Sequence, residues 1–323
     1  MNVLRTFVLG MAVAGLATAG AEARTLKVGH VLAADHPVHK GLEFMAAKVD
    51  EKTGGKLKLR IYPNGQLGSQ REMLELMQNG LMDITMANVS TMENFSPLYG
   101  VLTLPYIFRD REHAWKVLSG DVGRKILDSS AKNGLKGLTW FDNGTRSFYC
   151  HKPITSPKDL EGLKVRVQPS PTTIEMVRLL GGSPTPIPWG ELYTALQQNV
   201  VDCAESNMTA LTLARHGEIM KYFSYNEHTQ VPDVMVMSAK VFDGLSPEFQ
   251  KAVTDSAAET MKFFWDLWGA ELKKADKEAE EKMGVEINYP DKKPFMEKVL
   301  PMHEAAAKAS PEIAELIADI KAQ

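Results

Sequence analysis

The residues best suited to bind a ligand lie in a short segment that contains Arg166. Residues 163–168 alternate apolar and polar side chains, as in a β-strand with one buried face. Pro169 ends this strand, because proline cannot donate to a ladder. An arginine on the polar face is a permanent cation that can hold a carboxylate or a phosphate by two parallel hydrogen bonds. The alternative interpretation is a surface arginine on an edge strand.

Motifs for other kinds of chemistry are missing from the sequence. There is no nucleophile elbow, dinucleotide fingerprint, phosphate-binding loop or paired-histidine zinc motif. His303 and Glu304 lack a second histidine, and no cysteine stands beside a histidine at metal-ligand spacing. The net charge of −3 provides no basic field for nucleic acid. We therefore expect no enzyme, no cofactor, no metal and no nucleic-acid partner.

The first 23 residues have the composition of an export signal. Arg5 supplies the positive start, residues 6–18 are mostly apolar, and residues 21–23 match the small-x-small cleavage pattern. A membrane anchor is the alternative, but the apolar run is too short to span a bilayer. We expect a mature chain that begins at Arg24 and is located in the periplasm.

The chain has two cysteines, Cys150 and Cys203, which are too few for a disulfide scaffold. In an oxidising compartment they can pair with each other. Two buried free thiols are the alternative, because sequence spacing does not reveal whether the two residues lie close together.

Strands and helices alternate along the chain. Residues 26–31 and 56–62 have the pattern of strands on either side of a helix. This βαβ pattern predicts a mostly parallel sheet. Three prolines between residues 184 and 188 predict a stiff extended connector. An apolar stripe from Ser246 to about Met283 predicts one helix of about 55 Å. A chain of 323 residues usually forms two domains, so we expect this helix to bridge two lobes.

Several segments together resemble the solute-binding subunit of TRAP (tripartite ATP-independent periplasmic) transporters, of the DctP type. The combination is specific and covers the whole chain, although each segment alone is common. The segments are Gly29-His30-Val31, Pro63-Asn64-Gly65-Gln66-Leu67-Gly68, Leu104-Pro105-Tyr106, Gly144-Thr145-Arg146, Leu160-Glu161-Gly162-Leu163-Lys164-Val165-Arg166, Ser183-Pro184-Thr185-Pro186, Glu191-Leu192-Tyr193-Thr194-Ala195-Leu196-Gln197 and Val201-Asp202.

The resemblance implies an α/β, two-lobed periplasmic-binding-protein-like fold with mixed sheets and a long lobe-bridging helix. Lobe 1 would comprise residues 24–144 plus 232–268, and lobe 2 residues 145–231 plus 269–323. A small organic acid would bind in the cleft between them, and the lobes would close around it by a hinge motion. The partners implied are the small and large integral membrane subunits of the transporter, and we expect a monomer.

The same resemblance assigns roles to residues of the second lobe. Arg166 would pair with the ligand carboxylate, Arg146 would make a second polar contact, and Asn207 would support the same end of the ligand. Trp189 would pack on the ligand, with core packing as the alternative. The chain departs from the commoner pattern at Cys203, where glycine is usual, and Asn207 lies one residue further on than in many relatives.

Polar residues at strand ends and helix starts of the first lobe are expected to contact ligand hydroxyls. Helix caps and turn hydrogen bonds are the alternative roles for such residues. The four candidates are His30, Gln70, Glu72 and Asn88. They favour a sugar acid such as a uronate or an aldonate. A C4-dicarboxylate, held by Arg146 as a second clamp, and a ligand-sensing role remain alternatives.

Overall fold

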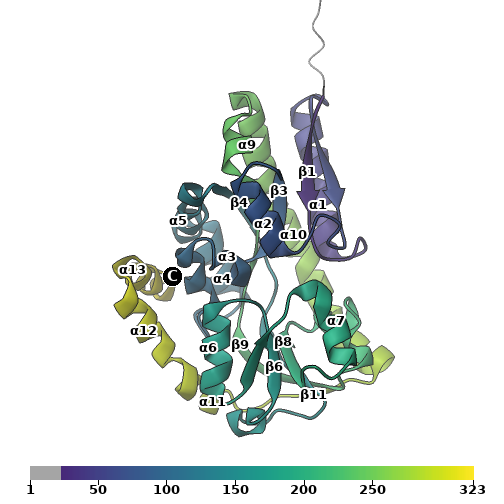
Figure 1. Ribbon diagram of the computed structural model, residues 1–323, viewed down its shortest axis with the longest axis vertical. Helices are drawn as coiled ribbons and strands as arrows, with labels where there is room; N and C mark the ends of the chain where they lie inside the picture. The colour runs from purple at the N-terminus through teal and green to yellow at the C-terminus, as the bar shows by residue number, and fades with distance from the viewer. Residues whose placement is uncertain (1–22) are drawn as a thin grey trace, which may run out of the picture.

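The computed structural model describes residues 23–323 as two β-sheets in separate halves of the molecule, each covered by helices (Figure 1). The first sheet has five strands in the order β2-β1-β3-β10-β4, and the second has six in the order β11-β9-β5-β8-β6-β7. This arrangement confirms the expected two-lobed α/β fold. The expected export signal lies outside the described residues, apart from Ala23.

The bounds of the elements follow the chain. The strands are β1 (Arg24–Gly29), β2 (Leu57–Tyr62), β3 (Ile84–Asn88), β4 (Leu135–Phe141), β5 (Arg146–Cys150), β6 (Lys164–Val167), β7 (Ser183–Pro186), β8 (Cys203–Ser206), β9 (Tyr222–Thr229), β10 (Asp233–Ser238) and β11 (Glu286–Asn288). The α-helices are α1 (Pro37–Lys52), α2 (Gln70–Gln78), α3 (Val89–Met92), α4 (Arg111–Ser119), α5 (Asp121–Ser129), α6 (Pro171–Leu180), α7 (Trp189–Gln197), α8 (Thr209–Thr212), α9 (Ala239–Asp243), α10 (Pro247–Met283), α11 (Lys293–Val299), α12 (Pro301–Ala309) and α13 (Pro311–Ala322). The 3₁₀ helices are η1 (Pro97–Thr103), η2 (Ala131–Asn133), η3 (Pro157–Leu160) and η4 (His216–Glu218).

Both sheets are mixed, so the mostly parallel sheet predicted from the βαβ pattern is only partly right. β1 pairs in parallel with β2 and β3, as that pattern requires. β10 then runs antiparallel between β3 and β4, because it enters this sheet directly from the second one rather than through a crossover helix. The chain passes between the sheets at residues 142–145, which separate β4 from β5, and at residues 230–232, which separate β9 from β10.

The strand that contains Arg166 lies inside the second sheet. β6 pairs in parallel with β8 on one side and with β7 on the other. The proline-rich segment expected to be a connector therefore forms β7, and its prolines are tolerated because β7 is the edge strand. Arg166 is consequently buried, at 0% exposure, which excludes the surface-arginine interpretation.

Helix α10 connects the two halves. It begins after Ser246, whose side chain caps the helix, and ends at Gly284, which has a left-handed backbone (φ 63°). Its first part packs against α1 and β4, and its later part against α8 and β11. The expected lobe-bridging helix is thus present with the predicted bounds.

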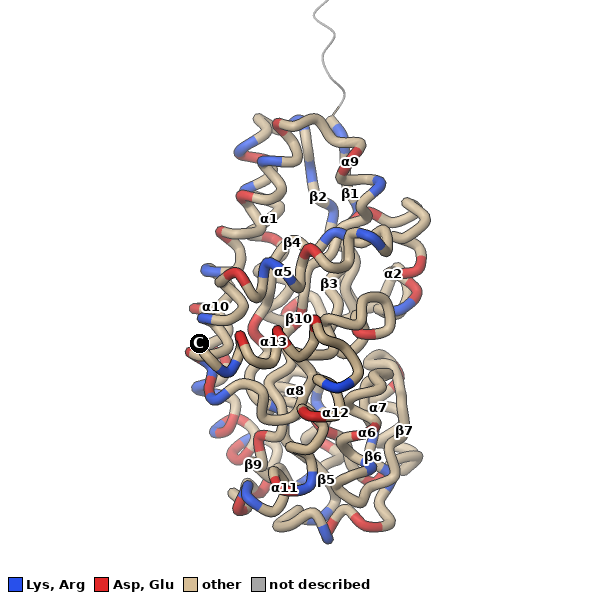
Figure 2. Tube along the Cα trace, turned by 90° about the vertical axis from the view of Figure 1, so that its left-hand side faces the viewer, with Lys and Arg blue, Asp and Glu red and all other residues tan. Residues whose placement is uncertain are grey.

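The C-terminal helix α13 lies against the helices of the first half. It contacts α5 and η1, and the carbonyl of Ile320 lies 2.9 Å from Nε2 of His113. We therefore propose that α13 belongs with the first lobe rather than with residues 269–323 of the second. Acidic and basic residues are interspersed along the described part of the trace (Figure 2). Within residues 23–323, no helix has both the length and the apolar composition needed to cross a bilayer.

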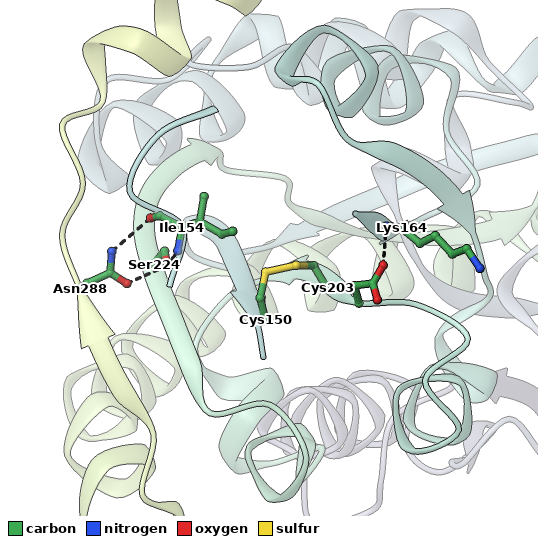
Figure 3. The surroundings of a disulfide bond; sticks show 7 residues. Cys150, Ile154, Lys164, Cys203, Ser224 and Asn288 are labelled. Atoms are coloured by element: carbon green, nitrogen blue, oxygen red, sulfur yellow. Dashed lines mark hydrogen bonds between the residues drawn. A yellow bond between two sulfur atoms is a disulfide. The ribbon is translucent and has the colours of Figure 1, made fainter. Parts of the chain in front are cut away.

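Cys150 and Cys203 form a disulfide bond (Figure 3). They are opposite each other in the antiparallel pair of β5 and β8, with their Cα atoms 4.3 Å apart. Of the two alternatives left open by the sequence, pairing is the one that the structure contains. The bond links the strand that carries Arg146 to the strand that carries Glu205.

Replacing both cysteines by serine should lower the free energy of unfolding by about 2–4 kcal/mol, because the bond closes a long loop in the unfolded chain. Urea denaturation measures this difference. A reductant should lower the free energy of unfolding of the parent protein to that of the double variant. The free energy of unfolding of the double variant should not change. If the urea midpoint of the parent protein is the same with and without the reductant, the bond does not stabilise the fold.

Candidate ligand-binding site

A cavity of about 680 Å³ lies between the two halves and is lined by both. This volume is typical of small-molecule sites. The first half contributes residues of β10 and of the loops and helices that follow β1 and β2, and the second half contributes residues of β5 to α8 and η4. The lining residues that matter for the chemistry are His30, Gln70, Glu72, Asp233, Arg146, Arg166, Trp189, Asn207 and His216. Seven of the eight residues predicted from the sequence are therefore on this wall.

Arg166 projects its guanidinium from β6 into a buried position on the wall. Its Nε donates to the carbonyl of Ile187 at 2.9 Å, whereas Nη1 and Nη2 are buried and have no hydrogen-bond partner among the described residues. The guanidinium carbon lies 5.8 Å from the ring centre of Trp189. Burial lowers the pKa of Arg166 to about 10, so the side chain still carries its charge at neutral pH.

An unpaired buried charge is costly, and an anion that supplies two acceptor oxygens would remove that cost. The two free nitrogens of Arg166 form the fork that a carboxylate fits. The guanidinium of Arg166 could therefore serve as the cationic partner of a bound carboxylate.

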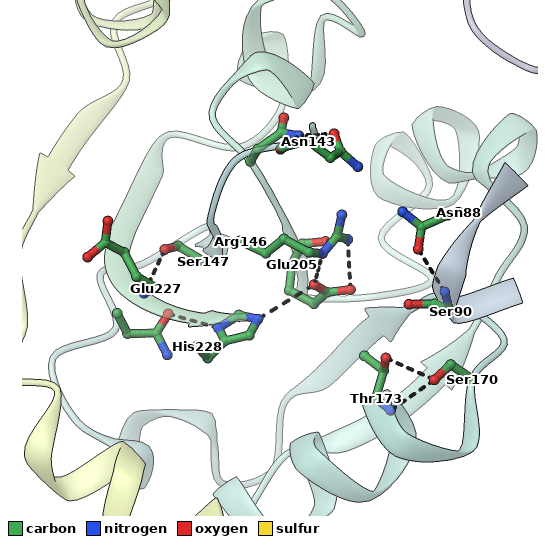
Figure 4. A network of polar contacts seen from close by, with 12 residues as sticks. Asn88, Ser90, Asn143, Arg146, Ser147, Ser170, Thr173, Glu205, Glu227 and His228 are labelled. Carbon is green, nitrogen blue, oxygen red and sulfur yellow. Dashed lines mark hydrogen bonds and ion pairs between the residues drawn. The ribbon is translucent and has the colours of Figure 1, made fainter. Parts of the chain in front are cut away.

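Arg146 is already paired with a carboxylate inside the protein (Figure 4). Its Nε donates to Oε2 of Glu205 at 2.6 Å, and its Nη2 donates to Oε1 at 3.0 Å and to the Glu205 carbonyl at 2.7 Å. Burial would raise the pKa of Glu205, but the charge and hydrogen bonds of Arg146, together with the imidazole of His228 at 3.5 Å, lower it to about 2. The charge of Arg146 is therefore compensated before any ligand arrives.

The two remaining arginines of the wall each have a carboxylate partner in the described part of the chain. Arg71 pairs with Glu75, and Arg215 pairs with Glu218. Arg166 is thus the one lining arginine without a carboxylate partner among residues 23–323.

The histidines of the wall are neutral at pH 7. Burial lowers the pKa of His30 to about 3, of His36 to about 4 and of His216 to about 3. They can therefore donate or accept a hydrogen bond without adding charge to the cavity.

Trp189 forms a flat side of the cavity at the start of α7. Its ring centre lies 5.2 Å from that of His216, whose Nδ1 is 2.9 Å from the hydroxyl of Tyr149. Burial raises the pKa of Tyr149, so this hydroxyl keeps its proton. The indole face suits the apolar face of a sugar ring or a carbon chain. His216 was not predicted from the sequence, because it lies on a short 3₁₀ helix with no pattern that marks it.

Gln70 presents an amide donor to the cavity. Its Oε1 accepts from the backbone nitrogen of Asn88 at 3.1 Å and from the hydroxyl of Thr91 at 3.0 Å. A backbone nitrogen is always a donor, so the oxygen must face Asn88 and the amide nitrogen remains available. His30 is held by a 2.9 Å contact between its Nε2 and Nδ1 of His39, and its own Nδ1 has no partner among the described residues.

Two of the predicted first-lobe residues have structural roles. Glu72 lines the cavity, but its carboxylate accepts from the backbone nitrogen of Ser69 at 2.8 Å in a capping box that starts α2. Asn88 does not line the cavity. Its Oδ1 caps α3 by accepting from the backbone of Ser90 at 3.0 Å, and its Nδ2 donates to Asp233 at 2.7 Å. The helix-cap alternative therefore describes both residues.

Asn207 lies on the wall with both of its donors in use. Its Nδ2 donates to the carbonyl and to the side-chain oxygen of Asn143, at 2.7 and 2.6 Å. Its Oδ1 accepts from the hydroxyl of Thr209 at 2.6 Å. These bonds connect the end of β8 to the segment after β4, so Asn207 has only an acceptor oxygen left for a ligand.

Hydrogen bonds also join the two halves at the rim of the cavity. The carboxylate of Glu93, which follows α3, accepts from the hydroxyls of Ser170 and Thr172 at 2.5 Å each. Nδ2 of Asn94 donates to the carbonyl of Pro169 at 2.7 Å. The first and second halves are therefore in direct contact beside the site.

Asp233 is an acidic residue of the wall that was not predicted from the sequence. Burial raises its pKa to about 7, although a hydrogen bond from Asn88 and the charge of Arg146 oppose this effect; the carboxylate of Asp142 adds to it. The folded protein therefore holds a proton on Asp233 at pH values where the unfolded chain, with a pKa near 3.8, has lost it.

The contribution of Asp233 to stability is complete below pH 3.8 and is lost as the pH rises through about 7. Asp233→Asn keeps the acceptor for Asn88 and removes the titration. We expect this variant to be as stable as the parent at pH 4 and more stable by up to about 4 kcal/mol at pH 8. Urea unfolding at the two pH values measures this. If the variant and the parent differ in free energy of unfolding by the same amount at pH 4 and at pH 8, burial of the Asp233 charge has no cost.

Comparisons with known proteins agree with this architecture. A model of bacterial extracellular solute-binding protein family 7 (DctP) matches residues 28–309. The 2,3-diketo-L-gulonate-binding periplasmic protein of Escherichia coli is 34% identical over 260 residues, which is 79% of each chain.

Two solved structures are similar over nearly the whole chain. A TRAP periplasmic solute binding protein from Anaerococcus prevotii, with bound α/β-D-glucuronate, is 37% identical with a TM-score of 0.90, covering 92% of this chain and 97% of that one. Another from Xanthobacter autotrophicus, with bound β-D-galacturonate, is 36% identical with a TM-score of 0.89, covering 92% of this chain and 99% of that one.

Proposed function

Because the chain belongs to family 7 of the bacterial extracellular solute-binding proteins, we propose that it captures a sugar acid in the periplasm and delivers it to a TRAP transporter. Members of this family are the solute-binding proteins of transporters, so we infer that this chain binds its ligand without transforming it. The membrane partners would be the small and large integral subunits of that transporter.

The observation that carries this proposal is the free fork of Arg166. Two buried guanidinium nitrogens, which have no partner among residues 23–323, face a cavity of ligand size. A bidentate carboxylate would satisfy both nitrogens and neutralise the charge. The ligand would then be fixed in direction by one end, with the rest of it against Trp189.

A sugar acid fits the cavity better than a C4-dicarboxylate. A dicarboxylate needs a second free cation, and Arg146 is already neutralised by Glu205. The wall offers neutral donors and acceptors instead, including Gln70 and His216, which suit hydroxyl groups. Relatives with bound glucuronate and galacturonate support the same choice.

A panel of acids tests this proposal by thermal shift, followed by calorimetry. We expect glucuronate or galacturonate to raise the melting temperature, since a ligand at about 100 times its Kd stabilises the folded state by about 2.7 kcal/mol. Succinate and malate serve as matched acids without the hydroxylated ring. If these two stabilise the protein and the uronates do not, the ligand is a dicarboxylate. Chemical change of a stabilising ligand during incubation would identify an enzyme instead.

A further inference from the structure

The carboxylate of Asp233 is an unexpected group for a cavity that is to receive an anion. The residue is 8% exposed, and it stands at the start of β10 in the first half, on the same cavity wall as Arg166 of the second. Its Oδ1 accepts from Nδ2 of Asn88 at 2.7 Å. Its Oδ2 has no hydrogen-bond partner, and no ion pair includes this residue in the part of the chain that the structure describes.

The fold holds Asp233 firmly in this position. Asp233 lies opposite Asn88 of β3 and Phe141 of β4, so strands on both sides fix its backbone. Asn88 also caps α3 with its other side-chain atom, and its backbone nitrogen is bound by Gln70. The side chain is therefore part of a connected polar network that ends in one accessible carboxylate oxygen and the free amide of Gln70.

An ionised carboxylate can only accept hydrogen bonds, and it has about four acceptor positions on its two oxygens. A second carboxylate from a ligand would be repelled here, whereas hydroxyl groups would be bound. Hydrogen bonds to a charged acceptor are stronger than those between neutral groups. Adjacent hydroxyls on a carbon chain or ring can reach one carboxylate together.

We propose that Asp233 accepts hydrogen bonds from adjacent hydroxyl groups of the ligand and makes the site selective for polyhydroxylated monocarboxylates. This inference rests on the proposed function. The carboxylate end of the ligand lies on Arg166 in the second half, and the hydroxyl end lies on Asp233 in the first. One molecule then connects the two halves, and an acid without hydroxyls leaves a buried acceptor unsatisfied.

The Asp233→Asn variant tests this assignment with two ligands at pH 8. Galacturonate carries the hydroxyls, and tetrahydropyran-2-carboxylate has the same ring and carboxylate without them. We expect the variant to bind galacturonate about 10- to 100-fold more weakly than the parent. Its affinity for tetrahydropyran-2-carboxylate should stay within about threefold of the parent value, because this ligand makes no such hydrogen bond.

Asp83→Asn is the matched control, since Asp83 precedes β3 and accepts from the backbone of Lys27 but does not line the cavity. This control should bind both ligands as the parent does. Unfolding curves without ligand confirm that both variants fold.

The outcomes separate the inference from the function on which it rests. If the parent binds galacturonate and Asp233→Asn binds it equally well, the assignment of Asp233 is wrong and the proposed function stands. An equal loss for both ligands would also overturn it, because the residue would then act on the carboxylate end or on the fold. If the parent binds neither glucuronate nor galacturonate, both proposals are wrong.

Discussion

The Arg166→Met variant is expected to lose the ligand while remaining folded. Methionine fills a similar volume without the charge, so the carboxylate would lose two charge-assisted hydrogen bonds of about 1.5–3 kcal/mol each. The affinity for a sugar acid should fall by about 10²- to 10⁴-fold, as measured by calorimetry.

The same change should not destabilise the ligand-free protein. Arg166 is fully buried, and two of its three guanidinium nitrogens have no partner among the described residues, so methionine removes an uncompensated charge from the interior. The loss of the hydrogen bond to the carbonyl of Ile187 lowers the free energy of unfolding by about 1 kcal/mol. We therefore expect the free energy of unfolding to stay level or to rise.

Arg178→Met is the matched control. Arg178 lies on the exposed face of α6 and pairs with Glu175 at the surface. This variant should bind the ligand as the parent does and unfold within about 1 kcal/mol of it. Unchanged affinity in Arg166→Met would remove the basis of the proposed site.

Glu205→Gln is expected to have the largest effect on stability. The change leaves Arg146 buried, charged and without its carboxylate, in a wall that already contains the free charge of Arg166. Breaking one side of a buried ion pair costs about 3–5 kcal/mol. Urea denaturation of the ligand-free protein measures this loss. The double variant Arg146→Met with Glu205→Leu should recover much of it, because no unpaired charge then remains.

The same substitution should also alter ligand selectivity. With Glu205 neutral, the cavity has two free arginines, which is the arrangement that a dicarboxylate requires. Succinate and malate should therefore stabilise Glu205→Gln more than they stabilise the parent. Glu175→Gln breaks a surface pair with Arg178, and neither residue lines the cavity, so this variant serves as control, with an expected change of about 1 kcal/mol or less. Equal stability of Glu205→Gln and the parent would contradict a compensating role for this carboxylate.

Much of the fold could be predicted from the sequence because its signals are local. The apolar stripe and the caps at Ser246 and Gly284 define α10 within the chain itself. The strands β9 and β10 were not recognised from their residues. All of β10 is buried, so it lacks the alternation that marks a half-buried strand, whereas β9 mixes aromatic and polar residues without strict alternation. The edge strand β7 was missed because its prolines argue against a strand unless its position at the edge is known.

The site was predictable only in part, because pairing across the fold cannot be read from spacing. The sequence indicates that Arg166 and Arg146 are candidates, but it does not show that Glu205 neutralises one of them. It also does not show that Asn88 stands behind the wall, or that Asp233 stands on it in contact with Asn88. These facts depend on which strands become neighbours in the two sheets.

The most direct test of the central claim is a crystal structure of the protein with bound galacturonate. We predict that both carboxylate oxygens of the ligand lie about 2.7–2.9 Å from Nη1 and Nη2 of Arg166, while Arg146 keeps Glu205 as its partner. A ligand whose carboxylate lies elsewhere in the cavity, with the Arg166 nitrogens still unpaired, would contradict the account.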